Sequence, residues 1–457
     1  MSVKIDTVIP RTHENVSRTI KLALAEAHRR QVLADRNLFN HPDRNYDIEQ
    51  EVRIVNRITG KPVNTERFFN SGTIRVRFDT SVDNLEYNAN GITPLTLKGI
   101  KQLFRSFLKQ TILLQKAIKR DNPDAILVPI GVQPLVRAGE WEHLIVSDYV
   151  SRIRYQLMET MTIGENTNPQ MIITNPDTGE TFVDKASNLS AMTRTSGTQF
   201  HISERSPSEA IRAYNASIAI APIMIALFGN SPYLGGIDTG RASNRIEILR
   251  QGEQKRAGLP EPVSSIEDYY VKQLAKADPP FIEIEDSEKA LDLSMGAMHT
   301  VTRIIIDTKN NRIRNEFRHV DSQSPYRSIQ AFLLTLGLIE GLKRKKLPEF
   351  RESQANFEQA VWGLKAKMSW LQKEVRVQEL GLWCIDVAQI AFVDTEIAEI
   401  AQSFLNPLKN EIASGQTQAD VMRNSVNDDV ANGKTLYNAI AQSLNRTNKE
   451  MLKFVNY

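Results

Sequence analysis

Carboxylate side chains recur on three regions of this chain that have the pattern of β-strands. The first carries Glu49 and Glu51, the second Asp79 and Glu86, and the third Glu316. Hard divalent cations take oxygen ligands, and Mg²⁺ is usually bound by a few carboxylates together with substrate phosphates. If the three strands lie side by side, the pattern predicts a site for such cations.

Glu49 and Glu51 are two residues apart in an alternating segment, so a strand places both on one face. Val52, Ile54 and Ile58 are expected to point the other way, toward helices. Two glutamates on one face repel each other unless a cation or an arginine lies between them. A solvated sheet face is the alternative, because antiparallel sheets are often exposed to water on one side.

Asp79 and Glu86 flank a short turn that contains Ser81 and Asp83. The turn can return the chain so that the two carboxylates converge. Capping or simple solvation is the alternative, because acidic residues are common near turns for those reasons.

Glu316 and Arg318 also share a strand face, with Asp321 nearby. We assign Glu316 to a metal and Arg318 to an anion, because the planar guanidinium suits bidentate recognition of phosphate or carboxylate. The alternative is a cross-strand salt bridge, which contributes little at a surface.

A glycine-rich loop at residues 229–245 ends with Arg241, Ser243 and Arg245. Backbone amides, a helix N-terminus and arginines together suit phosphate or carboxylate. The loop lacks the Gly-Lys-Ser/Thr ending of a P-loop, and a purely structural loop is the alternative. On a separate strand Gln199 and His201 share one face, where a histidine is either a ligand or a satisfied polar residue.

The elements that must position these residues are mostly hairpin-linked strands. Strands are expected from residue 46, at 73–78, 125–131, 172–183, 197–203, 300–307 and 312–317, and helices at 13–39, 94–118, 206–227, 243–251 and from 328 onward. Hairpin-linked strands favour an antiparallel sheet with helices packed on one side, an α+β fold.

The composition excludes several classes of protein. The 457 residues have a net charge of +3, too small an excess to indicate nucleic acid or a membrane surface as partner. A single cysteine, Cys384, rules out intramolecular disulfides and favours a reducing compartment, so we expect a cytoplasmic protein. The longest apolar stretch, at 216–228, contains Ser217 and Pro222 and is shorter than the roughly 20 residues of a membrane span.

The order of these motifs resembles glutamate–cysteine ligases and related carboxylate–amine ligases of the glutamine-synthetase-like superfamily. The matching segments lie at 48–60, 79–94, 128–134, 196–203, 230–245 and 315–321. The resemblance implies a curved antiparallel sheet that forms a funnel with helices outside. It also implies ATP, Mg²⁺ or Mn²⁺, and a reaction that phosphorylates a substrate carboxylate before an amine attacks the acyl phosphate.

The resemblance also assigns roles to single residues. It makes Glu49, Glu51, Glu86 and Glu316 metal ligands, with Asp79 assisting. Arg318 would hold the γ-phosphate and the acyl phosphate. Catalysis or nucleotide and substrate binding would involve Arg241, Ser243 and Arg245, and the site would be lined by Gln199 and His201.

The expected reaction is glutamate–cysteine ligation, a step of glutathione biosynthesis, with small-molecule substrates. The alternative is an ATP-dependent ligase or transferase with another amine, a protein or a natural product as substrate, and a non-enzymatic binding module is a third. The sequence departs from the family at Asp47, where a glycine is common, and at Gln199, where some relatives have histidine. We expect an N-terminal helical arm at 1–40, a catalytic domain at 41–345 and a C-terminal helical subdomain at 346–457; a homo-oligomer is left open.

Overall fold

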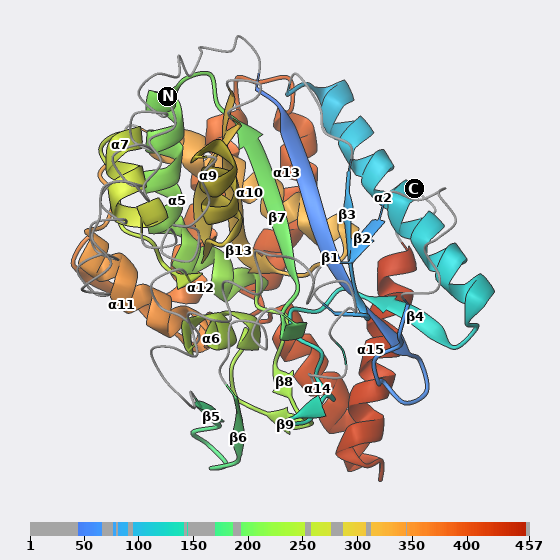
Figure 1. Ribbon diagram of the computed structural model, residues 1–457. Helices are drawn as coiled ribbons and strands as arrows, with labels where there is room; N and C mark the ends of the chain where they lie inside the picture. Colours follow the sequence, from blue (N-terminus) through green and yellow to red (C-terminus); the bar gives the residue numbers. More distant parts are fainter. Residues whose placement is uncertain are drawn as a thin grey trace, which may run out of the picture.

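A computed structural model describes most of the chain and shows a mixed helix and sheet fold (Figure 1). The described residues are 44–65, 76–78, 81–89, 95–140, 144, 170–185, 193–251, 257–275, 287–307, 312–343 and 345–453. The expected N-terminal arm and Asp79 lie outside them.

The fold is built on a seven-stranded sheet in which every recorded strand pairing is antiparallel. The strand order is β12 (Thr302–Asp307), β13 (Arg312–Asp321), β7 (Gly197–Ser203), β1 (Tyr46–Asn56), β3 (Asn84–Asn88) and β2 (Val76–Phe78), and β4 (Ala125–Val128) pairs with β1. The sheet is open, and its architecture confirms the predicted α+β class.

Helices and short strand pairs complete the fold. The helices are α2 (Leu97–Asp121), α5 (Pro207–Phe228), α6 (Asn244–Gln251), α7 (Ile266–Tyr269), α9 (Ser287–Gly296), α10 (Pro325–Leu342), α11 (Phe350–Ala360), α12 (Val377–Phe392), α13 (Ala398–Ala413), α14 (Gln418–Ala431) and α15 (Leu436–Lys453). The remaining strand pairs are β5 (Gln170–Thr174) with β6 (Thr181–Lys185), β8 (Tyr233–Leu234) with β9 (Ile237–Asp238), β10 (Ala257–Gly258) with β11 (His299–Thr300), and β14 (Lys367–Trp370) with β15 (Lys373–Arg376).

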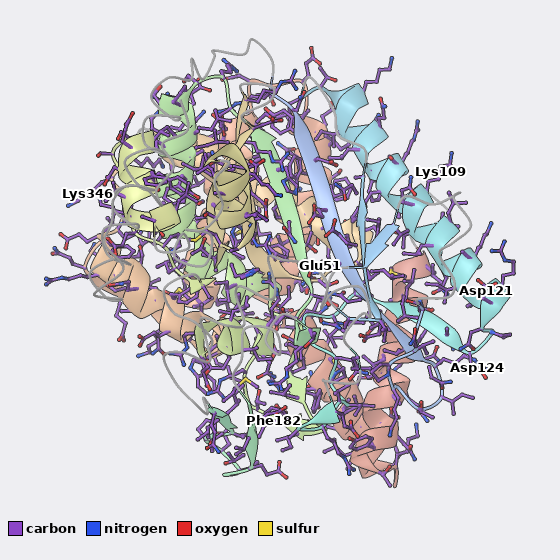
Figure 2. The ribbon with its side chains drawn as sticks, in the orientation of Figure 1. Glu51, Lys109, Asp121, Asp124, Phe182 and Lys346 are labelled. Atoms are coloured by element: carbon purple, nitrogen blue, oxygen red, sulfur yellow. The ribbon has the colours of Figure 1, made fainter. Side chains whose placement is uncertain are left out.

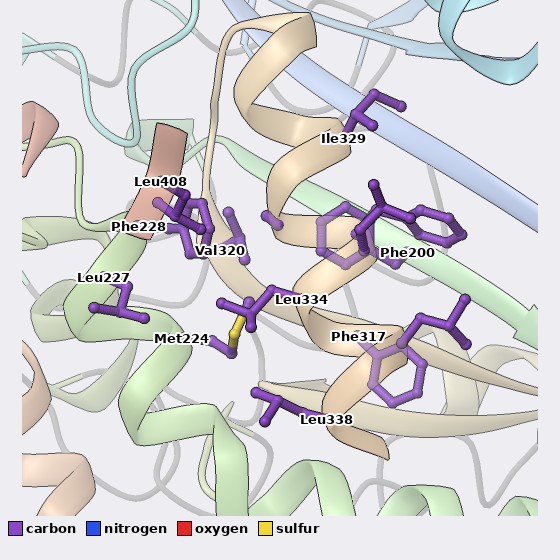
Figure 3. Close-up of a cluster of buried hydrophobic side chains, with 14 of the residues drawn as sticks. Phe200, Met224, Leu227, Phe228, Phe317, Val320, Ile329, Leu334, Leu338 and Leu408 are labelled. Carbon is purple, nitrogen blue, oxygen red and sulfur yellow. The ribbon is translucent and has the colours of Figure 1, made fainter. Parts of the chain in front are cut away.

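One face of the sheet is apolar and packs against helices, because successive side chains of a strand point to opposite faces. Phe200 of β7 and Phe317 of β13 are fully buried there beside Leu334 of α10 and Met224 of α5, as Figure 3 shows. Removal of this apolar surface from water is the main contribution to stability. The opposite face is left for polar side chains.

The expectation for Ile58 is wrong. β1 ends at Asn56, and Ile58 follows it in a turn, where its side chain is 61% exposed. The chain reverses at Gly60, whose φ of 67° lies in the left-handed region that favours glycine. Val52 and Ile54 are buried on the apolar side, as predicted.

Helix α5 is long and apolar enough to cross a membrane, and no other helix in the described ranges meets that test. Most of it is buried inside the structure, as expected of a core helix. Ser206 caps its first turn by accepting from the backbone N–H of Glu209, and Pro207 occupies the first helical position.

The C-terminal helices share hydrophobic clusters with the sheet. Leu405 and Ile412 of α13 belong to the same cluster as Phe200 and Phe317. Helices α14 and α15 lie beside β4 and pack against it through a second cluster (Figure 1). The division of the chain at residue 345 stays a prediction.

Candidate active site

The strand register brings most of the predicted site residues to the polar face of the sheet. Residues directly opposite each other in antiparallel strands lie on the same face. The opposite pairs are Glu51 with Glu86, Glu49 with Gln199, and His201 with Glu316. Figure 2 shows Glu51 on β1 near the centre of the view.

Glu316 lies between two arginines on this face. Its Oε1 is 2.5 Å from Nη1 of Arg318 and 2.8 Å from Nη2 of Arg303. Burial alone would raise the pKa of Glu316, but Arg303 and Arg318 outweigh it and hold that pKa well below the ordinary value. Glu316 is therefore an ionised carboxylate that fixes both guanidinium groups.

Gln199 joins the Glu316 end of the face to the Glu51 end. Its Oε1 accepts from Nη1 of Arg318 at 2.7 Å, and its Nε2 donates to Oε1 of Glu51 at 2.7 Å. The backbone N–H of Gly197 donates to the other oxygen of Glu51 at 2.7 Å. The result is a continuous polar network across β13, β7 and β1.

His201 lies between two of the glutamates. Its Nε2 is 3.4 Å from Oε2 of Glu49, and its Nδ1 is 3.8 Å from Oε2 of Glu316. Burial would raise the pKa of Glu49, but contact with His201 outweighs this and lowers it. His201 thus separates two carboxylates that would otherwise repel each other.

The oxygen donors on this face have the chemistry that Mg²⁺ prefers, but they are not gathered into one group. Among the described residues, no three His, Cys, Asp or Glu side chains are arranged as a metal site. Glu49, Glu51 and Glu316 instead contact the protein groups named above, and Glu86 is half-buried opposite Glu51. Their role as metal ligands stays a prediction.

The glycine-rich loop is attached to the end of β13 through Asp321. The carboxylate of Asp321 accepts from the backbone N–H of Asn230 at 2.8 Å, from Oγ of Ser231 at 2.7 Å and from Oγ of Ser243 at 2.8 Å. Burial raises the pKa of Asp321, against the effect of nearby Arg245. The Ser243 hydroxyl is therefore used within the loop in this structure.

A bulge in β13 makes this attachment possible. The pairing with β7 shifts register between Phe317 and Val320, so that Asp321 lies opposite Gly197. A bulge adds one residue to one strand and changes which side chains face which side. Arg318 and Asp321 are both directed to the polar side as a result, while His319 is buried beside Thr335 of α10.

Arg245 lies over Gly197 on the polar face. A Cβ atom on Gly197 would be only 2.6 Å from Nη2 of Arg245. Gly197 also donates to Glu51, so the guanidinium is placed near the Glu51 end of the network. The absence of a side chain at residue 197 is what allows this approach.

Gly197→Ala is expected to displace the Arg245 guanidinium and lower catalytic turnover by about tenfold to a hundredfold, because small misplacements at a site have large effects. The measurement is the steady-state rate of the ATP-dependent reaction that the family resemblance implies, together with a thermal melt. Ser203→Ala, at the other end of β7, is the matched control. Turnover equal to that of the parent would show that Arg245 has no role in the reaction.

Arg241 is not part of this face. Its Nη1 donates to the carbonyl oxygen of Thr174 at 2.9 Å, and its guanidinium lies 4.7 Å from the ring centroid of Trp362. A contact of this kind is a cation–π interaction. The structure therefore separates Arg241 from Arg245, although the sequence grouped them.

Two arginines that sequence reasoning did not select are important here. Arg303 contacts Glu316. The two residues lie opposite each other in the β12–β13 hairpin that the sequence predicts, so the register of that hairpin would have identified Arg303. Arg53 is fully buried and its Nη1 lies 3.1 Å from Oδ1 of Asp83 and 2.8 Å from Oγ of Ser81. Asp83 and Ser81 are thus buried partners of Arg53 and not a solvated turn.

A sequence model of the glutamate–cysteine ligase family 2 matches residues 93–442. The chain belongs to this family. Membership confirms the predicted family and its class, the ATP-dependent ligases. The matched range contains Gln199, His201, Arg245, Glu316 and Arg318, while β1 and β3 precede it.

Similarity to individual proteins is local in sequence and broad in structure. A putative glutamate–cysteine ligase 2-1 of Rubrobacter xylanophilus is 42% identical over 64 residues, which cover 14% of this chain and only 16% of that protein. The crystal structure of glutamate–cysteine ligase of Francisella tularensis in complex with AMP aligns with a TM-score of 0.58 at 11% identity, over 90% of both chains. The crystal structure of a bifunctional glutathione synthetase of Pasteurella multocida aligns with a TM-score of 0.58 at 12% identity, over 94% of this chain and 55% of that one. These two structures share the fold.

Proposed function

We propose that this chain is an ATP-dependent carboxylate–amine ligase that joins the γ-carboxylate of glutamate to an amine, with cysteine as the first candidate. The observation that carries the proposal is the network from Glu316 through Arg318 and Gln199 to Glu51 on one sheet face of a family 2 protein. A cytoplasmic location remains part of the proposal.

One end of the network suits the anionic groups of the substrates, and the other end suits a divalent cation. At one end, Arg303 and Arg318 carry two positive charges against the single negative charge of Glu316, and arginines suit phosphate and carboxylate groups. At the other end, Glu49, Glu51 and Glu86 offer oxygen donors of the kind that Mg²⁺ prefers. The donors present therefore fit a nucleotide phosphate bound together with Mg²⁺.

Bound Mg²⁺–ATP would supply the phosphoryl group and the charge neutralisation that its transfer needs. The protein's part is to fix Arg318. Its guanidinium is already held in place by hydrogen bonds to Gln199 and Glu316. A donor positioned before the substrate arrives stabilises developing negative charge without a reorganisation cost. Arg245 near Gly197 would bind a further anionic group of nucleotide or substrate.

The crystal structure of the Francisella tularensis ligase in complex with AMP supports a nucleotide as ligand of this fold. We expect ADP and phosphate to be released only when Mg²⁺, ATP, an amino acid with a free carboxylate and an amine are all present. The measurement is a coupled ADP-release assay against a panel of thiols and amines. Cysteine should give the highest rate with glutamate.

The panel also separates the alternatives. A higher rate with another amine or with a protein acceptor would keep the ligase reaction and replace cysteine. Release of AMP in place of ADP would indicate a different ATP-dependent transfer. If no carboxylate and amine pair releases ADP, the proposed ligase activity is wrong.

A further inference from the structure

A cavity of about 470 Å³ lies among the C-terminal helices, and no described residue that lines it belongs to the polar face of the sheet. It is open to solvent on one side and is lined mainly by the start of α10, the end of α13, and one face each of α14 and α15. Small-molecule sites commonly have volumes of roughly 300–1,000 Å³. The cavity is therefore large enough for a ligand of several heavy atoms.

The walls combine polar and apolar side chains at helical spacing. The wall residues at i, i+4 and i+7 or i+8 are Gln418, Met422 and Ser425 on α14, and Ser443, Thr447 and Met451 on α15. Residues at these spacings share one helix face. The inward face of a packed helix is normally an apolar stripe, so the serines, threonine and glutamine are unusual there.

Arg327 of α10 supplies a buried positive charge to the cavity wall. Its side chain donates to Oε1 of Gln330 at 3.1 Å and to Oε1 of Glu411 on α13. A guanidinium has five N–H donors, and these two hydrogen bonds use only part of that capacity. The remaining donors can serve an anionic group inside the cavity.

Side chains of both charge signs line the space. Glu411 is paired with Arg327, and Arg446 and Glu450 of α15 also line the cavity. A ligand with charge of one sign would meet a repelling group on either side, whereas a ligand with both signs satisfies both. Met422 and Met451 leave room for an apolar portion.

We propose that this cavity binds a small zwitterion, a free amino acid or a dipeptide, at a site separate from the proposed ligase site. Its carboxylate would face Arg327 and its ammonium group would face Glu411. Asn230 also lines the cavity, and its backbone N–H donates to Asp321 at 2.8 Å. An occupant would therefore contact the loop that carries Arg245.

The test is isothermal titration calorimetry of the full chain with the twenty free amino acids and with a set of dipeptides. At least one of them should bind, and Ser425→Trp, which fills the cavity from α14, should weaken that binding by at least about tenfold. Asn424→Trp, on the exposed side of the same helix turn, is the matched control and should leave the affinity unchanged. If only free amino acids bind, or only dipeptides bind, the result identifies the class of ligand.

Thr447→Met gives a second, smaller obstruction of the cavity if Ser425→Trp does not fold. The proposal is overturned if no compound in either arm binds, or if the affinity is the same in the filled and unfilled proteins. An amino acid that binds only at the ligase site would have the same affinity for the parent and for the variants with a filled cavity, and would therefore not support the proposal. The outcome is separate from the ligase proposal, since ADP release requires no ligand in this cavity.

Discussion

Glu316→Gln is expected to lower ADP release by at least about a hundredfold, the size of effect seen when a preorganised charge at a site is lost. The substitution keeps the volume of the side chain and removes the negative charge that holds Arg303 and Arg318. The two guanidiniums then repel each other, and the network to Gln199 loses its anchor. Steady-state kinetics at saturating ATP and Mg²⁺ measure the loss.

Folding of the Glu316→Gln protein is checked by its circular dichroism spectrum and thermal melt. Glu374→Gln is the matched control, because Glu374 lies on the exposed hairpin strand β15, where its side chain is 70% exposed. That control should retain the parent rate. A Glu316→Gln protein with a rate near that of the parent would show that Glu316 neither binds metal nor positions Arg318 for catalysis.

Asp83→Ala is expected to destabilise the protein by about 3–5 kcal/mol, the usual cost of removing one partner from a buried ion pair. Arg53 and Asp83 are both fully buried, so the substitution leaves the Arg53 charge without its carboxylate. Chemical unfolding followed by fluorescence gives the free energy of unfolding. A value equal to that of the parent would mean that Arg53 finds another anion or water.

The double variant Arg53→Met, Asp83→Leu completes the experiment. Replacement of a buried ion pair by apolar residues is often nearly neutral. We expect it to recover most but not all of the lost stability, because Arg53 also donates to Ser81 and to the carbonyl oxygen of Thr195. A double variant less stable than Asp83→Ala would contradict this explanation.

Much of the polar face could be predicted because strands alternate strictly. Glu49 and Glu51 are two positions apart, as are Glu316 and Arg318, and each pair indeed shares a face of the sheet. Only the tertiary structure shows that these strands are neighbours, with β7 between β1 and β13.

The errors and omissions have physical causes. Ile58 was assigned to a strand that ends two residues earlier, since alternation alone does not show where pairing stops. The direction of Arg241 depends on Trp362, more than a hundred positions later in the chain, and no local pattern reveals that contact. Arg303 could have been found by extending the register of the predicted hairpin.

The extra residue in β13 also limits how this strand can change in evolution. The side chains before and after the bulge are directed to the same side only because the strand contains one residue more than its partner. Deletion of His319 would remove the bulge and leave Arg318 and Asp321 two positions apart on one face. A regular strand that kept both intervening residues would instead turn Asp321 into the apolar layer, and the glycine-rich loop would lose its attachment. Homologues should therefore have either a bulge with two residues between Arg318 and Asp321 or a regular strand with one residue between them.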